Sequence, residues 1–426
     1  MKRTATALAA VVALAMGSVA GPGDWAMVQK DSNHTGFSEK GPAPPLKKAW
    51  FATPDDPETN FTTWPVVFGG TVYASSGPGV IAVEARTGKR SWYTHPVGGQ
   101  EIAAPAVDEA AVYVPVPPSL MLALDRQTGQ EIWRFQAEDE LEVSPTLHEG
   151  KLFFGSIRTQ YLYCLDATDG SLVWKTATPE FEPSAIPVVS GGMVIFSADA
   201  FETSATQIYG LDAANGQEVW RAPQRESNSS PSILDDRVII GGGDFFAYAL
   251  DVKTGKEVWK SPVVDKFSVR NSPAIAFGDV FLVDRIGNAY RLDGKTGKRK
   301  WFLADLEATY EQSFPVVAGK TLFIGGGSGR INAIDTDDGK LLWSEDVGGQ
   351  VYSGAADSER FYFGVRNENE GLYAYEHDPT GKLVKPENPS TVKSVLQALL
   401  IVLAIFGAIL LIARRMRNRI NRAGRI

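Results

Sequence analysis

A nine-residue unit recurs along this chain and constrains its fold more than any other feature. Each copy begins with an acidic residue, has a glycine four residues later, and has a tryptophan four residues after that glycine. Successive tryptophans are separated by 39 to 46 residues, and the seven full copies carry Trp92, Trp133, Trp174, Trp220, Trp259, Trp301 and Trp343. A period of this length is typical of propellers and solenoids, in which each repeat is one supersecondary unit.

A proline marks each unit in phase with the tryptophan. The prolines are Pro65, Pro105, Pro145, Pro187, Pro231, Pro273 and Pro315. Each precedes a short apolar strand, and two further strands lead to the acidic residue. The acidic residue and the glycine then bracket a tight hairpin, because glycine adopts a positive φ without strain. A fourth strand carries the tryptophan, whose ring can be buried between neighbouring units. Four short strands per period predict an all-β propeller.

The number of blades follows from the two ends of the repeat. Trp50 lies one period before Trp92, but no strands of its own precede it. An eighth unit, Glu376…Gly381…Val384, lacks a tryptophan-bearing strand. We therefore expect residues 46–52 to supply the outer strand of the blade formed by residues 351–384. This predicts an eight-bladed propeller of four-stranded antiparallel blades, closed by an N-terminal strand. The alternative is seven blades with loose ends.

Residues 248–259 read Tyr-Ala-Leu-Asp-Val-Lys-Thr-Gly-Lys-Glu-Val-Trp and resemble the hallmark of the pyrroloquinoline-quinone (PQQ)-like repeat family. Residues 290–301 are nearly as similar, and the resemblance covers about residues 24–384. It implies one of two functions. Quinoprotein dehydrogenases of this type hold PQQ and Ca²⁺ over the ring axis. Non-catalytic members bind partner proteins, as does the propeller lipoprotein of the outer-membrane β-barrel assembly machinery, to which this chain is closest in type.

Two departures from the dehydrogenase pattern favour the non-catalytic interpretation. The regular spacing leaves no room for the long insertions of those enzymes. Many of them also place two adjacent half-cystines over the cofactor, whereas Cys164 is the chain's one cysteine. We expect Cys164 to be buried in a third strand. The prediction is a protein-interaction scaffold without a cofactor. The alternative is a dehydrogenase-like quinoprotein with PQQ and Ca²⁺ at the axis.

The candidate ligand-binding residues lie three positions before the prolines, in what should be one layer near the axis. That layer comprises Thr62, Ile102, Glu142, Ser184, Asn228, Arg270 and Gln312. Glu142, Asn228, Arg270 and Gln312 could hold a cation or an anionic ligand. The other interpretation is a solvated channel mouth, because Ca²⁺ takes 6–8 oxygen ligands and only two obvious donors occur. The four histidines are scattered, which supports no metal site. Asp284-Arg285 is expected to be an exposed turn pair.

The two ends of the chain predict export and membrane anchoring. Residues 1–20 are typical of a signal peptide, with Lys2 and Arg3 before an apolar run and small residues at its end. The propeller should then occupy residues 21–384 and a short linker residues 385–394. Residues 395–413 are almost entirely apolar and long enough to span a bilayer. Six arginines in the tail, residues 414–426, predict a cytoplasmic C-terminus.

The charge distribution limits the possible partners. Nine of the 42 basic residues, and none of the 50 acidic ones, lie in residues 1–20 or 391–426, so residues 21–390 carry a formal charge of −17. An acidic surface repels phosphate backbones, which argues against a nucleic-acid partner. We expect the propeller to lie on the periplasmic or extracellular side, anchored through residues 395–413. Its partner should be an extracytoplasmic or membrane protein.

Overall fold

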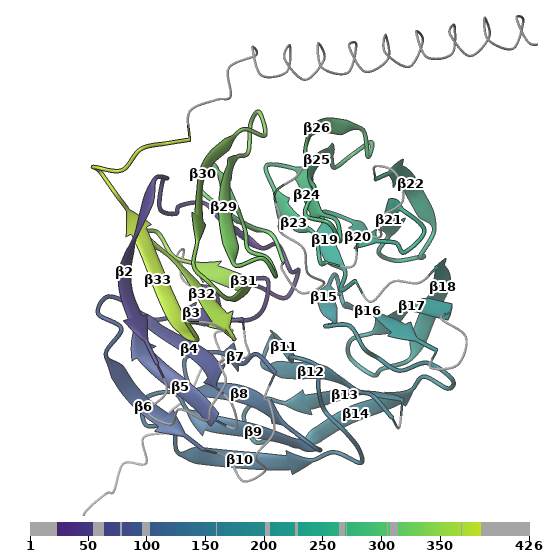
Figure 1. Ribbon diagram of the computed structural model, residues 1–426. Coiled ribbons are helices and arrows are strands. Elements are labelled where there is room, and N and C mark those ends of the chain that lie inside the picture. The colour runs from purple at the N-terminus through teal and green to yellow at the C-terminus, as the bar shows by residue number, and fades with distance from the viewer. Residues whose placement is uncertain are drawn as a thin grey trace, which may run out of the picture. The chain divides into compact units, whose positions relative to one another are not determined.

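Eight blades, each of four antiparallel strands, surround a common axis in the computed structural model, and the sheet of one blade gains a fifth strand (Figure 1). It describes residues 24–384 except 54–63, 77–78, 96–102, 159, 201–204, 226–228, 264–268, 270, 305, 307–313 and 368. The first strands of neighbouring blades contact one another around the ring, so they form its inner wall. The predicted eight-bladed architecture is therefore confirmed.

The first four blades are continuous in sequence, with the short strand of each innermost. Blade one contains β3 to β6 (Val66–Phe68, Thr71–Ser76, Gly79–Glu84, Arg90–Thr94). Blade two contains β7 to β10 (Ala106–Val107, Ala111–Val116, Leu120–Asp125, Glu131–Gln136). Blade three contains β11 to β14 (Thr146–His148, Lys151–Ser156, Tyr161–Asp166, Leu172–Ala177). Blade four contains β15 to β18 (Val188–Ser190, Met193–Asp199, Ala205–Asp212, Glu218–Arg225).

Blades five to seven repeat this order. Blade five contains β19 to β22 (Ser232–Leu234, Arg237–Gly241, Phe246–Asp251, Glu257–Pro262). Blade six contains β23 to β26 (Ala274–Ala276, Asp279–Val283, Ala289–Asp293, Arg299–Leu303). Blade seven contains β27 to β30 (Val316–Ala318, Thr321–Ile324, Arg330–Asp335, Leu341–Asp346) and gains β1 (Phe37–Ser38), parallel to β27.

The eighth blade closes the ring with strands from both ends of the propeller. It contains β31 (Gln350–Ala356), β32 (Arg360–Arg366), β33 (Gly371–His377) and, as its outer strand, β2 (Leu46–Ala52). β2 pairs antiparallel with β33 and has an irregularity just before Trp50, as the other fourth strands have before their tryptophans. The predicted closure is therefore present, and the seven-bladed alternative is wrong.

The tryptophans join each blade to the next. The indole nitrogens of seven of them, Trp50 to Trp301, each donate a hydrogen bond to the carbonyl that follows the acidic residue of the next blade, at 2.8–3.1 Å. Trp220 illustrates the close packing. Its ring lies against Gly255, where an added Cβ would come within 2.4 Å of a ring carbon and where φ is +66°. The tryptophan of each of these blades therefore packs against, and hydrogen-bonds to, the acidic–glycine hairpin of the next blade.

Two smaller predictions have opposite outcomes. Cys164 is fully buried in β13, as expected. The expectation of an exposed Asp284-Arg285 pair is wrong for Asp284, which is also fully buried. Its carboxylate accepts hydrogen bonds from the Asn288 side chain at 2.8 Å and from the Tyr290 hydroxyl at 2.7 Å. Asp284 therefore holds the turn between the second and third strands of blade six from the inside.

The predicted segments at the two ends remain predictions. Residues 1–20, 385–394, 395–413 and 414–426 lie outside the described residues. Within the described part of the chain, no helix is long and apolar enough to cross a membrane.

Candidate functional site

The chain's own residues 24–38 occupy the axis of the ring. The inner strands of six blades each donate one backbone N–H to a carbonyl of this segment, at 2.7–3.0 Å. The donors are Val67, Val107, Val189, Ile233, Ile275 and Val317, and their respective acceptors are Trp25, Ala26, Ser32, Asn33, Thr35 and Gly36. We call residues 24–38 the axial segment. Its carbonyls accept hydrogen bonds from backbone N–H groups at the inner edges of the blades, which would otherwise have no partner strand.

An apolar layer packs around the middle of the axial segment. Val28 lies in one cluster with Ala104, Val143, Ile186 and Phe314, and Trp64 packs against that cluster. These residues precede the first strands of five blades. The rings of Trp64 and Phe314 are 5.2 Å apart between centroids. In the described residues, the axis therefore contains packed side chains at this level, whereas the sequence left a solvated channel mouth open as an interpretation.

A buried histidine connects the axial segment to the inner wall of the ring. His34 is fully buried, and its Nδ1 lies 3.1 Å from the carbonyl oxygen of Pro231 in front of blade five. The Thr146 hydroxyl of blade three lies 3.5 Å from its Nε2. Burial lowers the pKa of His34 to about 4. The imidazole is therefore neutral at physiological pH, and it links the axial segment to blades three and five.

The structure describes only part of the predicted ligand-binding layer. Glu142 is exposed in front of blade three, while Asn228, Arg270 and Gln312 lie outside the described residues, as do Thr62 and Ile102. Partial burial and the nearby Glu140 raise the pKa of Glu142. Ser184 donates a hydrogen bond to Asp199 in blade four.

Sequence analysis did not identify the charged neighbours of Glu142. Glu140 forms an ion pair with Arg158 at 2.8 Å, and Glu182 of blade four lies near enough for Glu142 to raise its pKa, although burial is the larger cause. These residues gather on blades three and four only through the fold. No repeat position marks them in the sequence.

The described axial residues include several buried polar groups that have no charge. The buried polar groups without a hydrogen-bond partner among them include the carboxamide of Gln29 and the hydroxyls of Ser144 and Ser272. Neutral groups of this kind suit water or a neutral ligand. Ca²⁺ instead takes six to eight oxygens, carboxylates among them. No group of three or more His, Cys, Asp or Glu residues in the described chain could hold a metal ion.

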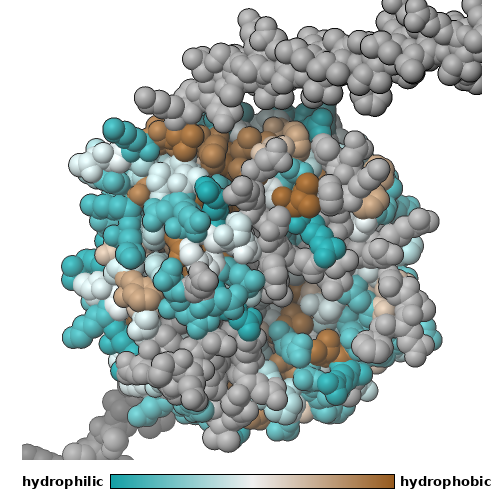
Figure 2. Space-filling model, in the orientation of Figure 1, coloured by the Kyte–Doolittle hydropathy of each residue, from teal (hydrophilic) through white to brown (hydrophobic). Residues whose placement is uncertain are grey.

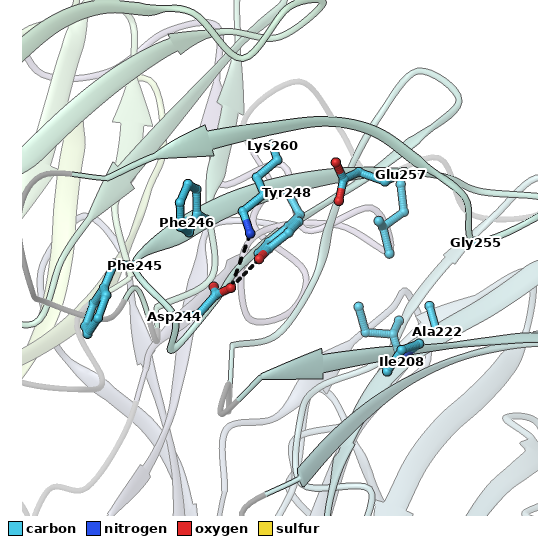
Figure 3. Close-up of a pocket in the computed structure, with 11 residues that line it drawn as sticks. Ile208, Ala222, Asp244, Phe245, Phe246, Tyr248, Gly255, Glu257 and Lys260 are labelled. Atoms are coloured by element: carbon cyan, nitrogen blue, oxygen red, sulfur yellow. Dashed lines mark hydrogen bonds and ion pairs between the residues drawn. The ribbon is translucent and has the colours of Figure 1, made fainter.

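A groove between blades four and five is the second candidate site, with a volume of about 960 Å³. Ile208 and Ala222 line it from blade four, and Tyr248, Glu257 and Lys260 line it from blade five (Figure 3). Apolar and charged side chains thus face each other across one cleft. Such a mixture is typical of sites that bind peptides or small ligands.

A lysine and an aspartate order the blade-five side of this groove. The Lys260 ammonium lies 3.8 Å from the centroid of the Phe246 ring and 4.9 Å from that of Tyr248. Asp244 lies 3.5 Å from the ammonium and accepts a hydrogen bond from the Tyr248 hydroxyl (Figure 3). Its contacts with Tyr248 and Asp244 raise the pKa of Lys260, which therefore carries its charge at neutral pH. The positive charge of Lys260 is therefore balanced by Asp244 of the same blade.

Sequence analysis missed this groove because its residues lie at ordinary repeat positions. One signal was available. Two residues after the tryptophan, blades one and three have a threonine and blade two has a phenylalanine. Blade four has Ala222 at this position, and Pro223 follows it. Ala222 is small, as are Ala52 and Ser261 at the same position, so this signal becomes specific only together with the lining of the groove.

Comparisons with known proteins place this chain among PQQ-like propellers. A family model described as outer membrane protein assembly factor BamB matches residues 118–267, 206–360 and 287–384. Tetrathionate hydrolase of Acidithiobacillus ferrooxidans is 26% identical over 225 residues, which are 44% of this chain and 44% of that protein. The chain therefore matches less than half of that relative's length.

Two solved structures share the fold at low sequence identity. BamB from Moraxella catarrhalis has a TM-score of 0.63 and 16% identity, covering 78% of this chain and 99% of that one. Quinohemoprotein alcohol dehydrogenase ADHIIG from Pseudomonas putida HK5 has a TM-score of 0.67 and 15% identity, covering 86% and 82% respectively. These likenesses extend to the fold alone, because one propeller architecture carries both binding and catalytic functions.

Proposed function

We propose that this chain, which belongs to the family described as outer membrane protein assembly factor BamB, is a non-catalytic propeller that binds partner proteins. Membership of that family concerns the propeller. The role as an interaction scaffold is our inference from how the propeller is built.

The observation that carries the proposal is the filled axis. In quinone-dependent relatives the reaction would need a ligand site over the ring axis, whereas the axial segment and the apolar layer around Val28 occupy the described part of that space. The unsatisfied polar groups there are hydroxyls and a carboxamide, the Asp31 carboxylate accepts hydrogen bonds from Asn33 and Thr35, and the described residues contain no group of three or more His, Cys, Asp or Glu that could hold a metal ion. The surfaces that remain for binding are the loops and the outer strands.

The outer surface is suited to proteins of opposite charge. The coloured atoms of the face in Figure 2 are mostly hydrophilic, with one larger hydrophobic area along the upper edge and smaller ones elsewhere. Residues 21–390 carry a formal charge of −17, which attracts basic partners over long range. Several fourth strands also expose the apolar residue just before their tryptophan, among them Ile132, Val173 and Val219. A charged surface with scattered apolar anchors favours protein binding over nucleic-acid binding.

Isolation of the full chain from gently solubilised native membranes tests this function. We expect a second protein to accompany it in stoichiometric amount, and raised salt to weaken the association because an acidic surface contributes to it. Recovery of the chain alone, as a monomer, would contradict the proposal.

We further propose that the propeller is exported and anchored as the sequence predicts. The motivation is the signal-like residues 1–20 and the apolar segment 395–413 followed by arginines. Mass spectrometry of the mature protein should show an N-terminus at Gly21. Protease added to intact cells or spheroplasts should remove the propeller and spare the tail. A mature protein that retains Met1, or a tail digested from outside, would refute this topology.

A PQQ-dependent dehydrogenase is the second candidate, favoured by the shared fold with quinohemoprotein alcohol dehydrogenase and by the acidic Glu142 near the axis. Under this alternative Glu142, Asn228, Arg270 and Gln312 would contact the ligand. Titration of the purified chain with PQQ and Ca²⁺ separates the two functions. Saturable appearance of a bound chromophore would support the dehydrogenase, and its absence is expected for the scaffold.

A further inference from the structure

We propose that the groove between blades four and five binds an extended segment of a partner protein that presents a lysine or arginine side chain between apolar ones. The groove is the cleft lined by Ile208 and Ala222 on one side and by Tyr248, Glu257 and Lys260 on the other. This inference rests on the proposed scaffold function and assigns it a surface and a class of partner.

The first support is the small side chain of Ala222 at the interface between blades four and five. Two residues after the tryptophan, Thr94 and Thr176 donate hydrogen bonds to the glycine carbonyl of the next blade, both at 2.6 Å. At the same position in blade two, Phe135 packs against Tyr163 with ring centroids 5.9 Å apart. Blade four has Ala222, which neither reaches the next blade with a hydroxyl nor fills the space with a ring. Ala222 therefore leaves room in the groove, and Ala52 and Ser261 occupy the same repeat position at two other interfaces.

The second support is an unpaired carboxylate in the groove. In blades two and four, a glutamate two residues before the tryptophan pairs with the arginine just after it, as in Glu131–Arg134 and Glu218–Arg221. The equivalents in blade five are Glu257 and Lys260. Lys260 turns instead toward the Phe246 ring and Asp244. The Glu257 carboxylate is left exposed, with no ion-pair partner among the described residues.

These two departures together define the ligand. An exposed carboxylate beside an apolar cleft suits a basic side chain, since a charge-assisted hydrogen bond is stronger than a neutral one. Ala222, Pro223 and Phe245 offer apolar surface along the same cleft, whereas Ile208 and Leu250 line it but are almost fully buried. The volume of about 960 Å³ lies within the range of sites that enclose a ligand rather than a single side chain. An extended peptide satisfies both requirements, because its side chains alternate in direction and can reach both blades.

Phe245 strengthens this assignment. It lines the groove beside Asp244, is 41% exposed, and has a φ of +72°, a backbone conformation that bulky residues rarely adopt. Strain of this kind tends to persist where a residue has a role in binding. An exposed phenylalanine held in place by the turn can contact an apolar residue of the bound segment.

The test uses the purified full chain and twelve-residue peptides that alternate valine and serine, with arginine, lysine, glutamine or glutamate at the centre. Binding is measured by fluorescence anisotropy of labelled peptides. Ala222→Phe fills the groove with the side chain that blade two already accommodates against Tyr163, so the variant should fold with a wild-type melting curve. Glu257→Gln removes the carboxylate without changing the volume, and Glu131→Gln is the matched change outside the groove.

The expected result is binding of the arginine and lysine peptides and not of the glutamate peptide. Ala222→Phe should weaken binding about tenfold or more, because one ring takes up the apolar part of the cleft. Glu257→Gln should weaken it about fivefold, the upper range for one partly solvated ion pair, and Glu131→Gln should leave it unchanged. If Ala222→Phe fails to fold, Glu257→Gln against Glu131→Gln decides the question.

Three outcomes would overturn the inference. These are no binding of any peptide to the wild-type chain, binding that neither groove variant weakens, and preference for the glutamate peptide. Co-purification of the native partner with wild type and with Ala222→Phe distinguishes failure of the groove proposal from failure of the scaffold function. A partner recovered equally by wild type and Ala222→Phe refutes the groove and leaves the scaffold, whereas recovery of no partner by either chain refutes the scaffold itself.

Discussion

Protonation of His34 should destabilise the propeller in mild acid, because this imidazole joins the axial segment to the ring wall and is fully buried. Burial lowers the pKa of His34 from 6.5 to about 4. In the unfolded chain the imidazole is solvated and keeps its ordinary pKa. Between those two pH values the unfolded chain binds more protons than the folded chain. The stability from this group is therefore fully present above pH 6.5 and is lost as pH falls toward 4.

The size of the effect follows from the two pKa values. A depression of ~2.5 pKa units corresponds to about 3 kcal/mol of unfolding free energy, and about 2 kcal/mol of this is already lost at pH 5. A loss of this size is large compared with typical domain stabilities, so it should be measurable by chemical denaturation.

The informative variant is His34→Asn. An asparagine amide can still donate to the Pro231 carbonyl, and asparagine tolerates the positive φ of +52° at this position. The smaller side chain should cost about 1–2 kcal/mol at neutral pH by leaving a cavity. Between pH 7.5 and pH 5, however, the wild-type chain should lose about 2 kcal/mol more than the variant. The exposed His95, changed to asparagine in the same way, is the control and should behave as wild type. Parallel stability curves for wild type and His34→Asn would refute the reasoning.

Three further predictions concern the repeat and the buried thiol. Trp259→Ala should destabilise the fold by about 3–5 kcal/mol in denaturant titrations, because it removes a buried ring and its hydrogen bond to Gly294; a loss below ~1 kcal/mol would show that the tryptophans do not join the blades. Gly255→Ala should destabilise by roughly 1–3 kcal/mol, since its Cβ would meet the Trp220 ring and φ is positive there, and an unchanged melting temperature would contradict that packing. Burial raises the pKa of Cys164 to about 12, so a thiol reagent should react slowly with the folded chain and rapidly in denaturant; fast reaction in the native state would contradict the buried position.

The ring could be predicted from the sequence because its chemistry repeats. The acidic residue, the glycine and the tryptophan of each unit perform local tasks that depend on residue type, and their spacing sets the blade. Trp50 also revealed the closure, since it stood one period ahead of Trp92. Because the tryptophan makes the same hydrogen bond in seven units, the copies within this one sequence can be aligned with one another.

The contents of the axis could not be predicted in this way. The axial segment binds the inner strands through backbone carbonyls, which every residue has, so no residue type marks the contact. His34 gave no signal because its partners, Pro231 and Thr146, lie more than 100 residues away. Asp284 was expected at the surface because a charged pair in a turn is usually solvated, whereas Tyr290 and Asn288 enclose it.

The groove is an intermediate case. It arises from two absences within the repeat, a missing large side chain at Ala222 and a missing partner for Glu257. Both become visible only when the blades are compared position by position with the structure in hand. Departures from a repeat are therefore informative in the same way as the repeat itself, since symmetry alone does not require them.

Photo-cross-linking in intact cells tests the central claim, that this propeller binds another protein, most directly. A benzophenone amino acid is placed singly at four exposed positions, Phe245 in the groove and Ile132, Val173 and Phe277 elsewhere on the ring. The account predicts a discrete adduct with a second protein on irradiation, with the highest yield from position 245. Absence of any protein adduct from all four positions would contradict it.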